Sequence, residues 1–106
     1  GDVDGRDVLM IDDMIDTGGT LVSACEKLRS AGVVEIYILV SHGLFTESSW
    51  TQLWSLGVKR IFCTDTVPLR PGIEAANISV LSVVPLISER LSWLDKDARR
   101  MTARGE

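Results

Sequence analysis

The apolar positions of the chain follow two patterns that alternate along the sequence. Four short segments are mostly apolar and rich in β-forming residues, which is typical of strands buried on both faces. These segments are 8–11, 36–40, 60–64 and 78–84. Elsewhere apolar residues recur every three or four positions, which predicts helices over 20–31, 47–56 and 85–94. Gly32 and Gly57 follow the first two, where glycine commonly ends a helix, and Pro85 suits a first helical turn.

Strands that alternate with helices through short connections predict an α/β fold with a parallel sheet covered on both faces. The 106 residues fit one domain, which we assign to residues 1–94, followed by a solvated basic tail over 95–106. In such sheets ligands bind beyond the carboxyl ends of the strands. The loops 12–19, 41–47 and 64–72 are therefore the candidate site.

Composition excludes several classes of function. Fifteen acidic against eleven basic residues give a net charge of -4, whereas proteins that track nucleic-acid phosphates usually carry the opposite excess. No apolar run reaches the roughly 18 residues of a membrane span, and the N-terminus lacks a signal-peptide pattern. Cys25 and Cys63 match no metal or redox spacing and are predicted to be buried. We expect a cytoplasmic protein with neither a nucleic-acid nor a membrane partner.

The candidate chemistry lies in residues 8–20, which read VLMIDDMIDTGGT. Gly18 and Gly19 permit positive φ and close backbone approach, so consecutive N–H groups can converge on one anion. The start of the following helix adds unpaired donors and a partial positive charge. Thr17 and Thr20 can add hydroxyl donors. The loop is therefore predicted to cradle one terminal phosphate monoester.

Two adjacent carboxylates, Asp12 and Asp13, precede this cradle. They would repel a phosphate, so we expect them to face a different part of the same ligand. Neighbouring acceptors suit the vicinal hydroxyls of ribose, or a Mg²⁺ ion held by those hydroxyls. A sugar phosphate satisfies both halves. A Walker-type loop is excluded because no lysine follows the glycines.

This segment resembles the phosphoribosyl-diphosphate loop of type I phosphoribosyltransferase folds, in which an apolar strand, two acids and a short spacer precede D-T-G-x-T. Further motifs resemble a single family in order over residues 1–94: GDVDGRDVLMIDDMIDTGGT, SHGLF, TDTVPL and ISVLSVVPLISERL. That family is ribose-phosphate diphosphokinase, also called phosphoribosyl diphosphate synthetase. The resemblance implies part of a Rossmann-like, phosphoribosyltransferase-type domain with a parallel sheet.

The resemblance also implies a reaction, in which diphosphate passes from Mg-ATP to the 1-hydroxyl of ribose 5-phosphate. Mg²⁺ is then the cofactor and ATP the co-substrate. Asp12 would contact the ribose hydroxyls, and Asp13 remains open as a group that orients hydroxyls or metal-bound water. The 5-phosphate would be held by Asp16, Thr17, Gly18, Gly19 and Thr20.

The chain also departs from that family. The family's ATP-binding residues, main Mg²⁺ ligands and catalytic Lys/Arg loop lie upstream of the segment that starts here at Gly1. No catalytic residue and no metal ligand is therefore assigned in this chain, and we expect it to be inactive alone. The family's Ser-rich ending, part of an allosteric phosphate site, is replaced by KDARRMTARGE. With its partner segment missing, the chain is expected to expose apolar surface and form a homo-oligomer.

Two other functions remain open. In a nucleobase phosphoribosyltransferase, Asp16 would act as a general base toward a purine nitrogen, but the sequence outside the loop matches the synthetase family better. The second open function is that of a non-catalytic subunit associated with the synthetase, although such proteins tend to lose the phosphate loop. His42 is interpreted as a hydrogen-bonded loop residue, with an acid or substrate contact as the alternative. Trp50 and Trp54 are interpreted as helix packing, with an interface as the alternative. Residues 64–66 either line the cleft or cap a strand end.

Overall fold

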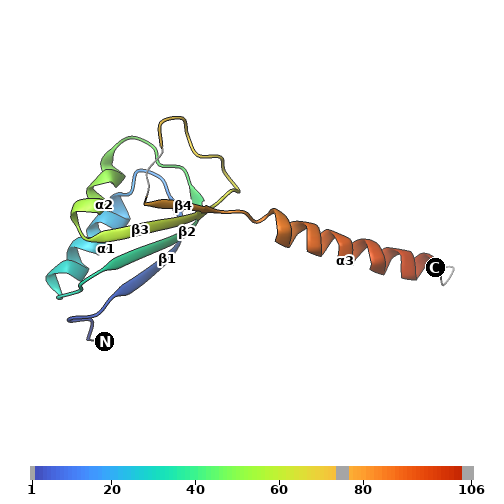
Figure 1. The fold of residues 1–106 in the computed structure, drawn as a ribbon, viewed down its shortest axis with the longest axis horizontal. Helices are drawn as coiled ribbons and strands as arrows, with labels where there is room; N and C mark the ends of the chain where they lie inside the picture. Colours follow the sequence, from blue (N-terminus) through green and yellow to red (C-terminus); the bar gives the residue numbers. More distant parts are fainter. Residues whose placement is uncertain (1, 74–76, 104–106) are drawn as a thin grey trace.

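A computed structural model describes residues 2–73 and 77–103, with side chains described as far as residue 96. The described residues form eight elements, whose arrangement is drawn in Figure 1. They are β1 (Val8–Ile15), α1 (Gly19–Ser30), β2 (Ile36–Gly43), the 3₁₀ turn η1 (Ser49–Thr51), α2 (Gln52–Ser55), β3 (Val58–Thr64), β4 (Ile78–Leu81) and α3 (Val84–Ala103).

The four strands form one parallel sheet in the order β1-β2-β3-β4. Met10 pairs with Ile38 between the first two strands, and Leu39 pairs with Phe62 between the second and third. Because the strands are parallel, their carboxyl ends meet along one edge, where the loops after β1, β2 and β3 begin. The predicted α/β fold with a parallel sheet is confirmed.

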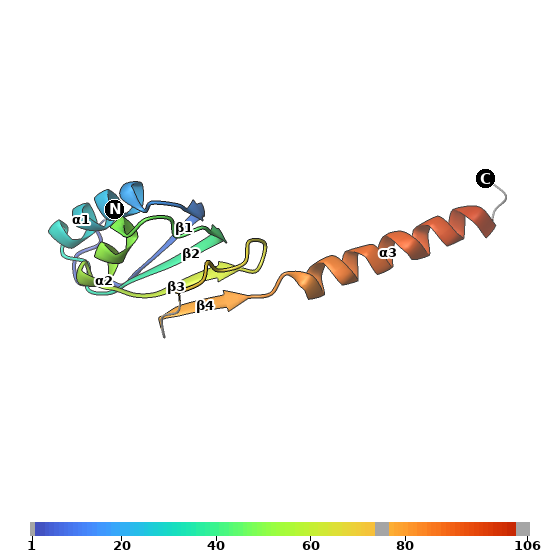
Figure 2. The same cartoon turned by 90° about the horizontal axis from the view of Figure 1, so that it is seen from above.

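One face of this sheet carries the core. α1 and α2 lie beside each other on that face (Figure 2). The buried side chains of β2 and β3 alternate along each strand and meet the buried side chains of the helices. They include Ile36, Ile38, Val40, Ile61, Cys63, Leu21, Cys25 and Leu53. The prediction that both cysteines are buried is confirmed, and burial raises the pKa of each thiol.

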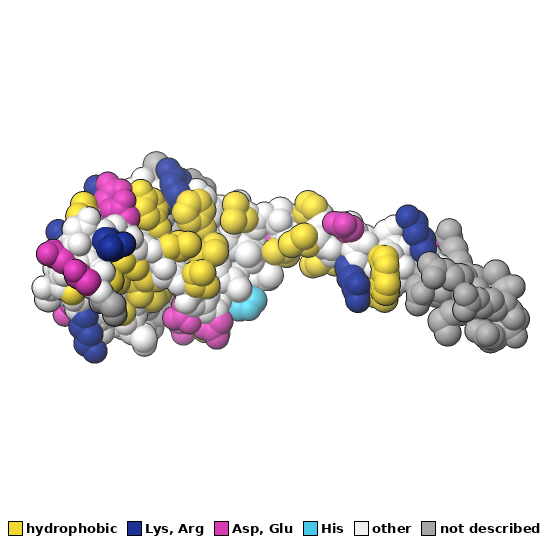
Figure 3. All heavy atoms as spheres, turned by 90° about the horizontal axis from the view of Figure 1, so that it is seen from below, with side chains coloured by type: hydrophobic (Ala, Val, Ile, Leu, Met, Phe, Trp, Pro, Cys, Tyr) yellow, Lys and Arg dark blue, Asp and Glu magenta, His cyan; other side chains and the backbone are white. Residues whose placement is uncertain are grey.

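The other face of the sheet is open, contrary to the prediction of cover on both faces. In the described part of the chain, no helix packs there, and Leu9 and Ile11 of β1 are 55% and 73% exposed. Leu81 of β4 is also exposed. Apolar side chains accordingly gather on the surface of the body of the molecule and along α3 (Figure 3). The continuous apolar run in β1 therefore supplies a second apolar face that this chain leaves uncovered.

The last helix, α3, projects away from the sheet (Figure 1). The radius of gyration is 19.0 Å, against about 13 Å for a compact domain of this length. The helix begins at Val84 rather than at Pro85 and continues to Ala103, beyond the predicted end at residue 94. Its apolar side chains Leu86 and Leu91 are exposed. α3 thus adds apolar surface to that of the open face.

Other boundaries also differ from the sequence pattern. β1 continues to Ile15, so that both acids of the predicted 12–19 loop lie within the strand. The helix predicted over 47–56 is divided into η1 and α2, and β4 ends at Leu81 rather than at residue 84. The prediction that Gly32 and Gly57 end helices is confirmed, because each has φ of +92° and directly follows the C-cap residue of its helix. Among the described residues, no helix is long and apolar enough to span a bilayer.

A candidate sugar-phosphate site

The turn between β1 and α1 consists of residues 16–18 and depends on a left-handed glycine. Gly18 has φ of +87°, a conformation that side chains with a Cβ rarely adopt. Its carbonyl accepts the Val22 N–H at 2.8 Å, which is the first hydrogen bond of α1. The Gly19 N–H donates to Thr17 Oγ1 at 3.5 Å. The strand thus turns into the helix within three residues.

The two glycines of this turn have different surroundings. A Cβ on Gly18 would lie 2.7 Å from Trp50 Cβ and 2.8 Å from Trp50 Cα, closer than real Cβ atoms approach one another. A Cβ on Gly19 would meet nothing nearer than Thr17 Oγ1 at 3.9 Å. Gly18 is therefore needed by the fold itself, whereas Gly19 borders open space. The sequence pattern does not separate these two roles, because Trp50 is distant along the chain.

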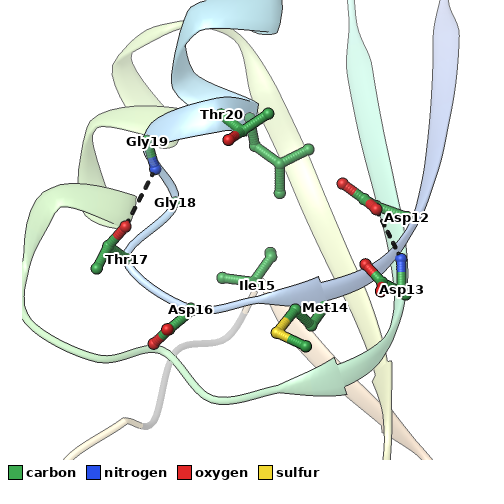
Figure 4. A pocket seen from close by; sticks show the side chains of 10 residues that line it. Asp12, Asp13, Met14, Ile15, Asp16, Thr17, Gly18, Gly19 and Thr20 are labelled. Atoms are coloured by element: carbon green, nitrogen blue, oxygen red, sulfur yellow. Dashed lines mark hydrogen bonds between the residues drawn. The ribbon is translucent and has the colours of Figure 1, made fainter.

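A pocket of about 220 Å³ opens over this turn, which is smaller than the roughly 300–1,000 Å³ of sites that enclose drug-sized ligands. It is lined by the continuous segment of residues 12–21. Asp12 and Asp13 lie on one side, and the turn from Thr17 to Thr20 lies on the other (Figure 4). All seven predicted site residues therefore line one pocket. Asp12 and Asp13 are separated from the helix start, as expected if they contact the sugar while the turn binds the phosphate.

The acidic side of the pocket is formed by consecutive residues of β1. Asp12 Oδ1 accepts the Asp13 N–H at 2.8 Å, and both side chains are exposed. The backbone of Asp12 pairs with Val40 of β2, so the carboxylate is carried by a hydrogen-bonded strand rather than by a loop. Such a rigid support can hold an acceptor in one place for a ligand hydroxyl.

Asp16 is held by a segment that the sequence pattern did not single out. The Thr46 hydroxyl donates to Asp16 Oδ1, and the Thr46 N–H donates to the Asp16 carbonyl at 3.0 Å. The carboxylate of Asp16 is therefore engaged by Thr46. Loop 41–47 was a candidate from its position after a strand, but nothing in the sequence identified Thr46 itself.

The charge of this pocket places a condition on any phosphate that it binds. Its ten lining residues, all in the described part of the chain, include three aspartates and no Lys or Arg. A phosphate would therefore have to be stabilised by N–H groups, threonine hydroxyls and the helix N-terminus. Any further neutralisation of the phosphate charge would have to come from a metal ion or from another part of a longer chain.

Residues at the neighbouring strand ends have mainly structural contacts. His42 pairs with Met14 within the sheet, and its Nδ1 lies 2.7 Å from Thr66 Oγ1, so it is hydrogen-bonded as predicted but belongs to β2. Asp65 Oδ1 accepts the Val83 N–H at 2.8 Å. Donation from the Ser82 hydroxyl and the Val83 backbone lowers the pKa of Asp65. Asp65 thus caps the segment after β4, which agrees with the capping interpretation.

The aromatic cluster beneath the turn also agrees with its predicted packing role. Trp50 lies edge-to-face against Phe45, with ring centroids 4.8 Å apart, and against Trp54 at 6.2 Å. Phe45 is fully buried and Trp50 nearly so. The prediction that Trp50 and Trp54 pack within the fold is confirmed.

Comparison with known proteins identifies the class to which this fold and pocket belong. The Phosphoribosyl synthetase-associated domain family matches residues 1–101. The chain belongs to this family.

The curated relatives of this chain are named ribose-phosphate pyrophosphokinase. The chain is 40% identical over 98 residues to a ribose-phosphate pyrophosphokinase of Pasteurella multocida, covering 92% of this chain and 31% of the relative. It is 40% identical over 94 residues to ribose-phosphate pyrophosphokinase 2 of Saccharomyces cerevisiae, covering 89% and 29%. A crystal structure of phosphoribosylpyrophosphate synthetase from Mycobacterium smegmatis superposes with a TM-score of 0.83 at 31% identity, covering 92% and 33%. The chain thus spans about a third of the length of these relatives.

Proposed function

We propose that this chain is the ribose 5-phosphate-binding part of a ribose-phosphate diphosphokinase. The reaction would transfer diphosphate from ATP to the 1-hydroxyl of ribose 5-phosphate. The observation that carries the proposal is the two-part pocket, in which adjacent carboxylates face a glycine turn at a helix start. The names of relatives at about 40% identity support the same reaction.

In this proposal each part of the loop has its own task. Asp12 accepts hydrogen bonds from the ribose hydroxyls, and Asp13 orients a hydroxyl or a metal-bound water. The N–H groups of Gly18, Gly19 and Thr20 bind the 5-phosphate, with the Thr17 and Thr20 hydroxyls as further donors. Positioning of this kind is what a diphosphoryl transfer requires of a protein, because little covalent chemistry falls to its side chains.

Mg²⁺ is the proposed cofactor. Asp12 and Asp13 offer the hard oxygen ligands that Mg²⁺ prefers, and both carboxylates are exposed. Within the described residues, no group of three His, Cys, Asp or Glu side chains comes together as a metal site. The ion would therefore share its ligands with substrate oxygens and water, as Mg²⁺ commonly does. When bound, it would neutralise part of the diphosphate charge.

The names of the relatives favour this reaction over nucleobase transfer, because they are called ribose-phosphate pyrophosphokinases. Asp16 Oδ1 accepts the Thr46 hydroxyl. Oδ2 and the remaining lone pairs stay available, so this contact alone does not distinguish the two reactions. In the diphosphokinase we propose that Asp16 belongs to the turn that holds the 5-phosphate.

A non-catalytic associated subunit is the second candidate, and the description of the matching family favours it. This chain keeps Gly19, which lines the pocket and has no close neighbour that requires a glycine, and a non-binding subunit would not need it. The decisive experiment is a diphosphoryl-transfer assay with Mg-ATP and ribose 5-phosphate on a chain of the relatives' full length that carries this segment. Formation of phosphoribosyl diphosphate and AMP supports the enzyme, and binding of ribose 5-phosphate without turnover supports the subunit.

We further propose that the protein is cytoplasmic and that it forms a homo-oligomer. Leu9 and Ile11 on the open face and Leu91 on α3 supply exposed apolar surface. Isolated apolar patches of more than a few hundred Å² favour association. The chain is therefore expected to self-associate.

Light scattering across a range of concentrations measures this association. The expected result is a mass above that of the monomer at high concentration, lowered toward the monomer by Ile11→Lys. Lys59→Arg, at an exposed site that keeps its charge, serves as the control. A wild-type chain that remains monomeric at all concentrations contradicts the prediction.

A further inference from the structure

We propose that Thr46 is a positioning residue for the phosphate turn, which it orders by holding the Asp16 carboxylate. The inference rests on the proposed function, because it concerns how the same turn binds a phosphate ester. It assigns a role to a residue that lies thirty positions from Asp16 in the sequence.

The backbone contacts show that residues 44–46 support the start of the turn. The Leu44 and Phe45 N–H groups donate to the Ile15 carbonyl at 2.8 and 3.2 Å. The Thr46 N–H donates to the Asp16 carbonyl at 3.0 Å. Three consecutive amides thus bind two consecutive carbonyls at the end of β1. The position of the turn is set by this segment as well as by α1.

The supporting segment is itself held in an unusual conformation. Phe45 and Glu47 have φ of +50° and +58°, which is uncommon for residues other than glycine. Phe45 is fully buried against Trp50, and Arg70 Nη1 donates to the Phe45 carbonyl at 3.2 Å. Such a backbone persists only where its surroundings fix it, and conformations of this kind cluster at functional sites.

The Thr46 side chain adds a contact that the backbone does not need. Its hydroxyl donates to Asp16 Oδ1 and so engages a carboxylate one residue before the predicted phosphate donors begin. A carboxylate released from this bond could accept the same N–H groups that a phosphate would use, and its charge would repel the phosphate. Thr46 therefore keeps the donors of the turn available to the ligand.

The test measures binding of ribose 5-phosphate and of inorganic phosphate to the chain by isothermal titration calorimetry. Thr46→Val removes the hydroxyl and preserves shape and the backbone bonds, whereas Thr46→Ser keeps the hydroxyl. We expect Thr46→Val to weaken binding of both ligands roughly 5- to 30-fold, the loss of about one hydrogen bond. Thr46→Ser should restore affinity to within about twofold of the wild type. Equal affinity of the valine and wild-type chains overturns the inference.

A double-mutant cycle separates positioning from a general loss of structure. Asp16→Asn removes the charge that Thr46 is proposed to restrain, so the effect of Thr46→Val should shrink to about twofold or less in that background. An undiminished effect overturns the positioning role, as does a serine variant that binds as weakly as the valine variant. If the wild-type chain binds neither ligand, the proposed function fails and this inference fails with it. If the wild type binds and only the variants disagree, the proposed function stands.

Discussion

Replacing Gly18 by alanine is expected to lower the free energy of unfolding by roughly 2–5 kcal/mol. Two costs add. The left-handed conformation at φ of +87° costs a residue with a Cβ roughly 1–2 kcal/mol. The new Cβ would also lie 2.7 Å from Trp50 Cβ and 2.8 Å from its backbone Cα, and overpacking of this kind costs roughly 1–3 kcal/mol. Because Trp50 packs against Phe45, the contact has little room to relax.

Gly19→Ala is the matched control, at the adjacent position of the same motif. Its Cβ would meet nothing within 3.9 Å, and alanine suits a helix better than glycine does. The free energy of unfolding should therefore stay within about 1 kcal/mol of the wild type. Gly19→Val should remain folded but bind ribose 5-phosphate more weakly, because its bulk stands where the ligand approaches. Urea unfolding of the variants decides the matter, and equal destabilisation at both glycines contradicts the account.

The second large effect concerns the two halves of the pocket. In a full-length chain carrying this segment, Asp12→Asn should lower kcat more than it raises the KM for ribose 5-phosphate. The substitution preserves size and one acceptor oxygen but removes the charge that faces the ribose hydroxyls and Mg²⁺. Thr20→Val should mainly raise that KM, because a phosphate contact made equally in the ground and transition states leaves kcat unchanged. For Thr20→Val, the expected loss in the binding free energy of ribose 5-phosphate is about 0.5–3 kcal/mol.

Steady-state kinetics with ribose 5-phosphate as the varied substrate measures both variants. The structure supports the comparison because Asp12 and Thr20 lie on opposite sides of one pocket (Figure 4). Thr20→Ser provides a control that retains the hydroxyl. Identical profiles for Asp12→Asn and Thr20→Val would show that the division into a sugar half and a phosphate half is wrong.

Much of the site could be predicted because its motif is local. The glycines, threonines and acids of residues 12–20 are contiguous, and a turn between a strand and a helix brings them together whatever the rest of the chain does. The contacts that stabilise this turn are not local. Trp50 against Gly18 and Thr46 on Asp16 each join residues about thirty positions apart. Periodicity carries no information about such pairs.

The fold was predictable to a similar extent, and its errors have physical causes. The apolar periods predict the strands and helices in the order that the structure shows. β1 extends through Asp12 because backbone pairing with Val40 continues there, and backbone pairing is indifferent to exposed acidic side chains. The prediction that both faces of the sheet are covered is wrong. An apolar run shows only that a strand can be buried on both faces, and not that this chain supplies the covering elements. Leu9 and Ile11 are exposed in this chain, which spans about a third of its relatives' length.

The central claim is that the turn over residues 16–20 binds the phosphate of a sugar phosphate while the preceding acids face its hydroxyls. Amide chemical shifts from ¹⁵N-resolved NMR, followed as ribose 5-phosphate is added, test this claim most directly. We predict that Gly18, Gly19 and Thr20 shift with both ribose 5-phosphate and inorganic phosphate, whereas Asp12 and Asp13 shift only with ribose 5-phosphate in the presence of Mg²⁺. Unchanged amides at the turn, with saturating ligand and a folded chain, would contradict the account.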